Sequence, residues 1–275
     1  ILPGTAYVGL CSVLIGQAGG DGWAFDLQDL AWSSPYRWVP AAAKQLSIRG
    51  RRLGPSLSIE IASSSDARPL HFTARADLGG RPPTADGEPI PAIRERCTRS
   101  ADVAGFYALA ADFGMVFGES FRCIARASKG PGEALVEAKL PTGTRRGGTT
   151  GLPIDPGLLD AVFQSAFFSV EEGFDGPHVP VRAKAVRIHG DLGSHLVIHV
   201  RAVAQTSDGF TFEYRLLAPS GAVIGEIEAL TFQRIEAVRG RSALAERSIN
   251  IFEPVWLPDA AVGLGEPPTA VLVLG

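Results

Sequence analysis

Two long apolar runs dominate the pattern of hydrophobic and polar positions along the chain, and each is followed by a set of alternating segments. The first run covers residues 5–18 and precedes Gly19-Gly20, a pair that favours the end of a helix. The second run starts after Asp155-Pro156, where Asp is a natural N-cap and Pro fits the first helical position. Its apolar residues cover most of a helix circumference, which is typical of a helix inside a core. The two runs therefore predict two buried helices.

Strand-like segments follow each predicted helix. Apolar and polar residues alternate most clearly in 196–201 and 210–215, which predicts antiparallel strands with one covered face. Residues 219–221 (PSG) predict the hairpin turn between the last two strands. The expected strands are 23–30, 45–49, 57–62 and 70–76 after the first helix, and 183–189, 195–204, 210–217 and 223–234 after the second. This order predicts an α+β fold in which a unit of one helix and one antiparallel sheet occurs twice.

Shifts in composition suggest where the units begin and end. Residues 79–99 are rich in Pro, Gly and charge, which predicts a linker between the two units. We therefore expect a first unit at 1–85, a linker at 86–100 and a second unit at 101–237. Residues 238–275 are interpreted as a linker and the start of a further domain. The chain starts without Met and stops in a strand-like segment, so we interpret it as part of a longer polypeptide.

Charge and cysteine content narrow the class of protein. A net charge of −3 gives no general reason to expect nucleic acid or an anionic membrane as a partner. The three cysteines show no metal-ligand spacing, and their odd number suggests reduced thiols in a cytoplasmic protein. No apolar run near the start is long enough to span a bilayer. We also find no glycine-rich dinucleotide motif and no cluster of metal ligands.

Asp160 is the strongest candidate for chemistry, because it interrupts the second apolar run. A carboxyl group on a buried helix is costly unless it is paired or used. Gln164 lies one helical turn further on and therefore on the same face. The alternative is that the two residues form a narrow solvated stripe on a half-exposed helix.

Several sequence blocks, taken in order, resemble the dehydratase domain of type I polyketide synthases. The blocks are ILPGTAY (1–7), GMVFGESF (114–121), DPGLLDAVFQ (155–164) and VPVRA (179–183), followed by FEPVW (252–256), which resembles the entry to a ketoreductase region. The resemblance covers about residues 1–237. It implies a double hotdog fold, in which two fused units each wrap an antiparallel sheet around a long helix.

The resemblance also implies a reaction. Dehydratases of this family remove water from a β-hydroxyacyl chain carried on the phosphopantetheine arm of an acyl carrier protein. Asp160 matches the acid that protonates the departing hydroxyl, and Gln164 matches the residue that orients the acid. A channel for the acyl chain is expected beside Asp160. The other expected substrate-binding positions are Pro3, Gly4, Phe117, Gly118, Phe121, Val179 and Pro180.

The implied partners are the acyl carrier protein and neighbouring synthase domains, and the resemblance allows a homodimer. No cofactor or metal is expected on this domain, because dehydration is redox-neutral.

Two departures from the family pattern leave other functions open. The family's base, a histidine, would lie nine residues before Pro3 and is therefore not in this sequence. Met115 and Phe117 stand where tyrosines are usual, and Glu119 replaces a proline. The alternatives are a double-bond isomerase, a cyclase that closes an oxygen heterocycle, or a non-catalytic structural domain.

The histidines in the sequence are expected to have other roles. His71 lies in a predicted strand and is expected to be structural, while His195 and His199 are expected to face outward. His178 adjoins the VPVRA block and is expected near the acyl channel. A replacement base among them is the less favoured interpretation.

Overall fold

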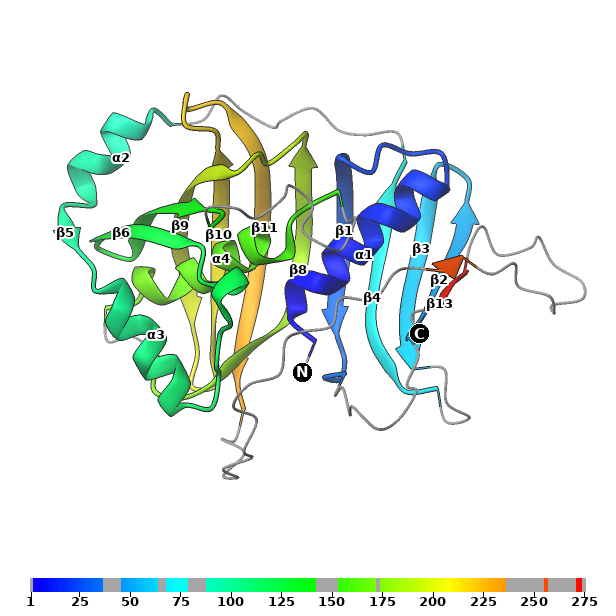
Figure 1. Ribbon diagram of the computed structural model, residues 1–275, viewed down its shortest axis with the longest axis horizontal. Coiled ribbons are helices and arrows are strands. Elements are labelled where there is room, and N and C mark those ends of the chain that lie inside the picture. The colour runs from blue at the N-terminus through cyan, green and yellow to red at the C-terminus, as the bar shows by residue number, and fades with distance from the viewer. Residues whose placement is uncertain are drawn as a thin grey trace, which may run out of the picture.

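The computed structural model describes residues 2–36, 46–63, 68–78, 88–141, 153–171 and 174–235, and the backbone of 255–256 and 271–273. A long helix lies against the sheet in each of two units that stand side by side (Figure 1). The first unit contains helix α1 (Gly4–Gln17). Its strands are β1 (Ala24–Trp32), β2 (Leu46–Leu53), β3 (Ser56–Ser63) and β4 (Leu70–Asp77).

The second unit contains helix α4 (Pro156–Gln164), which continues into the 3-10 helix η3 (Ser165–Ser169). Its strands are β6 (Ile124–Gly130), β7 (Glu133–Lys139), β8 (His178–His189), β9 (His195–Gln205), β10 (Gly209–Leu217) and β11 (Val223–Arg234). Three short strands complete the described set: β5 (Arg99–Ser100), β12 (Val255–Trp256) and β13 (Val271–Val273). The described strands form one sheet, in the order β12-β13-β2-β3-β4-β1-β8-β11-β10-β9-β7-β6-β5.

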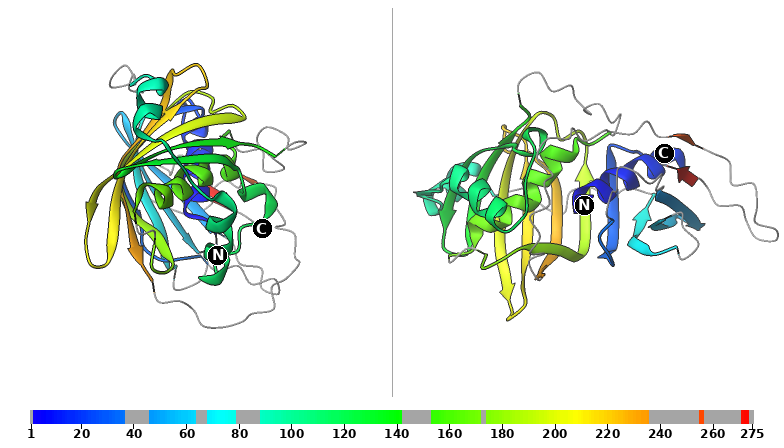
Figure 2. Two further views of the ribbon diagram at one scale, coloured as in Figure 1. Left: turned by 90° about the vertical axis from the view of Figure 1, so that its left-hand side faces the viewer. Right: turned by 60° about the horizontal axis from the view of Figure 1, so that its bottom comes forward.

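The two units join through β1 and β8, which pair antiparallel with Leu27 opposite Val186. Both residues are fully buried, so the core continues across the junction. An ion pair also crosses it, because Arg187 Nε on β8 lies 3.4 Å from Asp26 Oδ2 on β1; the Asp26 side chain is buried and that of Arg187 is partly buried. Figure 2 shows the sheet curling around the helices.

The caps and burial of α4 agree with the sequence expectation. Asp155 Oδ1 accepts hydrogen bonds from the backbone N–H groups of Gly157 (2.9 Å) and Leu158 (3.1 Å), as an N-cap should. Every residue from Gly157 to Gln164 is buried. The alternative of a solvated stripe is therefore wrong, because Asp160 and Gln164 are each only 7% exposed.

A glycine sets the position of α4 against the preceding segment. A Cβ atom on Gly157 would lie 1.9 Å from the backbone oxygen of Ser120, at the centre of the 3-10 helix η1 (Glu119–Phe121). No side chain fits in that space, so the start of α4 approaches η1 backbone to backbone. This approach brings the GMVFGESF block next to the helix that carries Asp160.

Several elements were missing from the sequence expectation. They include α3 (Val103–Asp112) and the strand pair β6–β7, which extend the second unit. The interval 86–100, expected to be a linker, contains helix α2 (Ile90–Arg96). Ile90 and Ile93 of α2 pack on the outer face of the sheet against Leu135, Val197 and Leu217. The linker expectation is wrong for residues 90–96, because α2 buries apolar side chains of its own.

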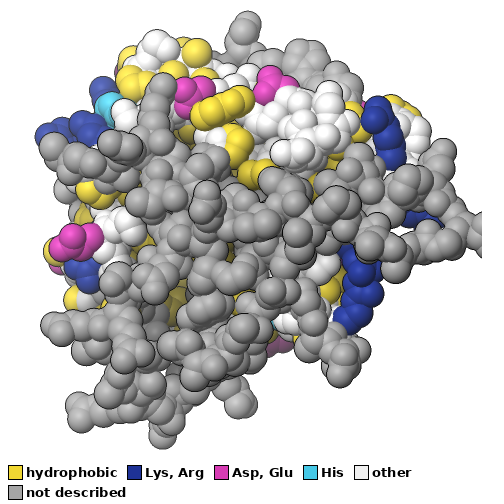
Figure 3. Space-filling model, turned by 45° about the vertical axis from the view of Figure 1, so that its right-hand side comes forward, with side chains coloured by type: hydrophobic (Ala, Val, Ile, Leu, Met, Phe, Trp, Pro, Cys, Tyr) yellow, Lys and Arg dark blue, Asp and Glu magenta, His cyan; other side chains and the backbone are white. Residues whose placement is uncertain are grey.

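The described surface carries mixed side chains. On the face shown in Figure 3, the described apolar side chains lie mainly along the top, and Lys and Arg side chains lie toward the left and right edges. The most exposed large apolar residues are Val116 in the loop before η1, Leu53 at the end of β2 and Trp23 just before β1, so they are far apart in the chain, as scattered surface residues usually are. No helix in the described part of the chain is long and apolar enough to cross a membrane.

Candidate active site

Asp160 lies inside the molecule, on α4, between the two units. Its Oδ1 accepts a hydrogen bond from Thr5 Oγ1 at 2.9 Å, and Thr5 lies in the first turn of α1. Its Oδ2 accepts a hydrogen bond from Gln164 Nε2 at 2.7 Å. Thr5 is fully buried, so all three polar groups are shielded from water. The site therefore contains one residue from the first unit and two from the second.

Burial changes the acidity of this carboxyl. The loss of hydration raises the pKa of Asp160 from 3.8 to about 6, while the hydrogen bonds from Gln164 and Thr5 act in the opposite direction. Desolvation therefore dominates. A carboxyl with this pKa is protonated in about one molecule in ten at pH 7, against about one in a thousand at the ordinary value, so it can serve as a proton donor.

Gln164 is held by three neighbours. Its Nε2 also donates to the backbone oxygen of Phe121 at 3.0 Å, and its Oε1 accepts from Tyr107 OH at 3.1 Å. Tyr107, on α3, in turn accepts a hydrogen bond from the backbone N–H of Ile124 at 3.4 Å. These contacts fix the amide that faces Asp160.

Sequence reasoning did not identify Thr5, Tyr107 or Trp32. Trp32 Nε1 donates to the backbone oxygen of Gly4 at 3.0 Å and so fixes the start of α1. The tryptophan ring also contacts Phe163 of α4 edge to face, with 6.0 Å between ring centroids. Thr5 and Tyr107 carried a weak signal, since each is a hydroxyl group in an otherwise apolar helical segment.

The expected substrate-binding residues fall into two groups. Pro3, Gly4 and Pro180 come together at the start of α1, where a Cβ on Gly4 would lie 2.6 Å from Pro180 Cγ. Val179 is half-buried beside Pro180 on β8. Whether these residues contact a substrate stays a prediction.

The second group lies on the other side of Gln164. Phe117 packs against Phe106 and Tyr107, with centroid distances of 6.2 and 5.9 Å. Gly118 precedes η1 and is exposed, and Phe121 contributes its backbone oxygen to Gln164. Of this group, only Phe121 is linked directly to the polar groups around Asp160.

The described histidines have partners of their own. His71 is structural, as expected: its Nε2 lies 2.7 Å from Ser63 Oγ and its Nδ1 lies 3.0 Å from Ser34 Oγ. His178 is buried, and its ring contacts those of Phe174 and Phe210. Its expected place near an acyl channel stays a prediction.

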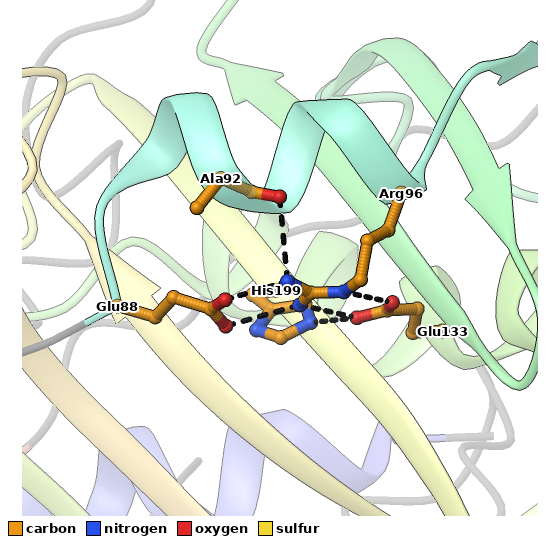
Figure 4. Close-up of polar contacts among 5 residues, drawn as sticks. All are labelled: Glu88, Ala92, Arg96, Glu133 and His199. Atoms are coloured by element: carbon orange, nitrogen blue, oxygen red, sulfur yellow. Dashed lines mark hydrogen bonds and ion pairs between the residues drawn. The ribbon is translucent and has the colours of Figure 1, made fainter.

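His199 corrects the expectation of a side chain that faces solvent. It is on the outer face of the sheet, but α2 covers it and leaves it 4% exposed. Figure 4 shows Glu133 on one side of the cluster, in contact with both His199 and Arg96. His199 Nε2 is 2.7 Å from Glu133 Oε2, and Arg96 Nε is 2.6 Å from Glu133 Oε1.

This cluster shifts the pKa values of its members. The hydrogen bond from Arg96 is the largest influence on Glu133 and lowers the pKa of its carboxyl to about 2. Burial lowers the pKa of His199 despite the adjacent carboxylate, so the ring is neutral at pH 7 and donates from Nε2. We infer that this cluster of Arg96, Glu133 and His199 holds α2 against the sheet.

The described residues do not show where the expected acyl channel runs. One small pocket among them does not include Asp160; its walls are Trp23, Leu140, Pro153, Ile154, Asp155, Asp191, Leu192 and Gly193. The channel therefore stays a prediction. Within the described ranges, no group of three or more His, Cys, Asp or Glu side chains is placed to hold a metal ion.

Comparison with known proteins identifies related sequences. The polyketide synthase dehydratase N-terminal domain family matches residues 85–242, which is more than half of the chain. A curated relative, the spectinabilin polyketide synthase system protein NorA' of Streptomyces orinoci, is 27% identical over 288 residues. That match covers all of this chain but 8% of NorA', so the chain spans a small part of its relative's length.

Solved structures with a similar fold are dehydratase domains. The domain from the CurK module of curacin polyketide synthase superposes with a TM-score of 0.75 at 22% identity, covering 86% of this chain and 84% of that one. The CurJ domain gives 0.75 at 18% identity, covering 85% and 83%. The dehydratase domain of RzxB from Pseudomonas fluorescens gives 0.70 at 21% identity, covering 85% and 86%. These similarities confirm the double hotdog fold.

Proposed function

Because the chain belongs to the polyketide synthase dehydratase family, we propose that it eliminates water from a β-hydroxyacyl chain to give an α,β-unsaturated thioester. The observation that carries the proposal is the carboxyl of Asp160, which is buried, hydrogen-bonded on both oxygens and shifted to a pKa of about 6. Elimination of water needs an acid in a site that excludes bulk water. Asp160 fits that requirement.

Asp160 is assigned the role of acid. Its proton passes to the β-hydroxyl as the carbon–oxygen bond breaks, and water leaves. A base removes the α-proton, and the electron pair of that carbon–hydrogen bond becomes the new double bond. Gln164 and Thr5 hold the carboxyl in place for this transfer.

The base is assigned to a histidine nine residues ahead of Pro3 in the parent polypeptide. Two of the buried histidines in the described residues support this assignment, because their ring nitrogens already have partners in Ser34, Ser63 and Glu133. Those partners occupy the nitrogen atoms that a base would need.

The acyl chain is proposed to arrive on the phosphopantetheine arm of an acyl carrier protein, with neighbouring synthase domains as further partners. The proposed reaction needs no nicotinamide, because the elimination is redox-neutral, and the acid and the base carry it without a metal. The start of α1, where Gly4 and Pro180 approach closely, is proposed to bind the thioester end. The three cysteines are free and buried, which supports a cytoplasmic location.

One observation favours a second candidate function. Phe117 has no hydroxyl group and packs into the ring cluster with Phe106 and Tyr107. A site with this change could direct the enoyl product to double-bond migration or to ring closure by an internal hydroxyl. Incubation with an enoyl thioester that carries a hydroxyl distinguishes a cyclase from a dehydratase by the product formed.

The test is a direct assay of dehydration. The domain, extended upstream to include the residue nine positions before Pro3, is incubated with a β-hydroxyacyl pantetheine thioester, and mass spectrometry follows the loss of one water. We expect turnover by the parent protein and at least a 100-fold lower rate for Asp160→Asn, because one general acid contributes about 10²–10⁴-fold. If a histidine is present upstream and no water is lost, the proposed function is wrong.

A further inference from the structure

Two backbone groups determine the direction of every hydrogen bond around Gln164. The backbone oxygen of Phe121 can only accept, so the atom of Gln164 that faces it at 3.0 Å must be the donor Nε2. Oε1 must then face Tyr107 OH, which donates to it at 3.1 Å. The backbone N–H of Ile124 can only donate, and it completes the set by donating to the tyrosine oxygen. The orientation of the amide is therefore fixed.

The fixed amide determines what each oxygen of Asp160 can do. Gln164 Nε2 has two hydrogens, one directed to Phe121 and the other to Asp160 Oδ2 at 2.7 Å. Because this group donates, Oδ2 must accept in both the ionised and the protonated states of the carboxyl. A proton on Oδ2 would place two donors face to face.

Thr5 is different, because a hydroxyl group can donate or accept. When Asp160 is ionised, Thr5 Oγ1 donates to Oδ1, which is 2.9 Å away. When Asp160 is protonated on Oδ1, the threonine rotates its hydrogen away and accepts. In both states the two carboxyl oxygens of Asp160 keep their partners, and Thr5 is the only partner of this carboxyl in the described residues that changes role between them.

We propose that the acidic proton of Asp160 resides on Oδ1 and that Thr5 is a positioning residue that holds it there. The catalytic consequence rests on the proposed function: the leaving hydroxyl must take its proton from Oδ1, on the side of the first turn of α1. The Oδ1–H bond breaks, an O–H bond forms on the departing oxygen, and Asp160 is left as a carboxylate that Thr5 and Gln164 stabilise. Tyr107 is a second positioning residue, which acts through Gln164.

An isosteric amide tests the location of the proton without any turnover. Asp160→Asn replaces the protonated carboxyl by a group with one acceptor oxygen and one donor NH2. We expect the introduced NH2 to face Thr5 and the introduced oxygen to face Gln164. Nuclear Overhauser contacts between that NH2 and the Thr5 methyl group, in the isotope-labelled full chain, would confirm this. Contacts from the NH2 to the Gln164 amide instead would overturn the proposal.

Titration of Asp160 in threonine variants tests the role of Thr5. Thr5→Val keeps the shape and removes the hydroxyl, so the carboxylate loses a donor. The pKa measured by ¹³C NMR should rise by about one to two pH units, as expected for one hydrogen bond to a charged group. Thr5→Ser keeps the hydroxyl and should titrate close to the parent protein. An unchanged pKa in Thr5→Val, with Thr5→Ser as the folded control, would refute the proposal.

Kinetics then connect the proton to the reaction. In the extended domain, Thr5→Val should lower kcat about 10- to 100-fold with little change in KM, and Thr5→Ser should restore most of it. The limb of the pH profile that belongs to the acid should move to higher pH in Thr5→Val. Failure of the parent protein to dehydrate would refute the proposed function alone, because the NMR experiments locate the proton independently.

Discussion

Asp160 combines two opposing influences in one side chain. Burial disfavours its charged form, whereas Thr5 and Gln164 stabilise that form with one hydrogen bond on each oxygen. The balance leaves a pKa of about 6, above the ordinary value of 3.8. Because this pKa belongs to the folded state only, the carboxyl also links folding to pH.

The sign of that linkage gives a prediction for stability. A folded-state pKa above the unfolded value contributes stability that is complete below about pH 4 and is lost as pH rises through about 6. From pH 4 to pH 7, the free energy of unfolding of the parent protein should therefore fall by about 2 kcal/mol relative to Asp160→Asn. Urea denaturation at several pH values measures this difference. A difference that does not vary with pH would contradict the assigned pKa.

The candidate site could be predicted from the sequence only where its parts are close in the chain. Asp160 and Gln164 share a helical face, so local periodicity placed them together. Thr5 lies 155 positions from Asp160, and Tyr107 lies 57 positions from Gln164. Contacts between residues so far apart in the chain depend on how whole elements pack, which residue spacing does not predict. The sequence shows that the hydroxyl groups of Thr5 and Tyr107 are present, but it does not show which residues they contact.

At the scale of elements, the close approach of α4 and η1 depends on a missing side chain. Gly157→Ala would place a Cβ 1.9 Å from the backbone oxygen of Ser120, and neither backbone can yield without moving α4. We expect this variant to lose about 2–4 kcal/mol of unfolding free energy and to disturb Asp160 as well. Circular dichroism in urea gives the stability, and the Asp160 titration reports the disturbance.

A glycine in the other central helix is the matched control. Gly16 is exposed near the end of α1, and a Cβ there would have its nearest neighbour at 3.8 Å. Gly16→Ala should be neutral or stabilise by up to about 1 kcal/mol, because alanine is the better helix former. Equal losses in both variants would show that the Gly157 contact is unimportant.

The elements themselves were predictable to different degrees. Both central helices and the eight strands that follow them appeared in the apolar pattern, with boundaries that differ by a few residues. Helix α3 carries an N-cap in Asp102, whose Oδ1 accepts from Gly105 N at 2.9 Å, and this is the one sequence signal that marks the start of the helix. Strand β6 has exposed residues on both faces and shows little alternation. Helix α2 is short and lies in a segment whose charge and proline suggested a linker.

At the scale of the whole molecule, the joined sheet makes the two units one folding body. The ion pair between the partly buried Arg187 and the buried Asp26 is part of the junction, and Arg187 Nη2 also contacts Glu228 at 3.2 Å. Removal of the cation would leave the Asp26 carboxylate buried without its charge partner.

Arg187→Met should therefore destabilise the whole domain by about 3–5 kcal/mol, in a single unfolding transition. Lys184→Met is the control on the same strand, because the Lys184 contact with Glu228 is largely exposed and should matter little. Calorimetry measures the loss of stability and the number of unfolding transitions in each variant. Two separate transitions in Arg187→Met would mean that the units fold independently, against the joined sheet.

The pairing of β1 with β8 has a consequence for recombination between related synthases. A crossover placed between the two halves would take β1 from one parent and β8 from another, and would separate residues that pack together across the sheet, such as Leu27 and Val186. The same crossover would separate Thr5 from the acid that it contacts. Chimeric enzymes should therefore inherit this domain as an undivided cassette, with exchange points placed beyond both helices and all the strands that connect them.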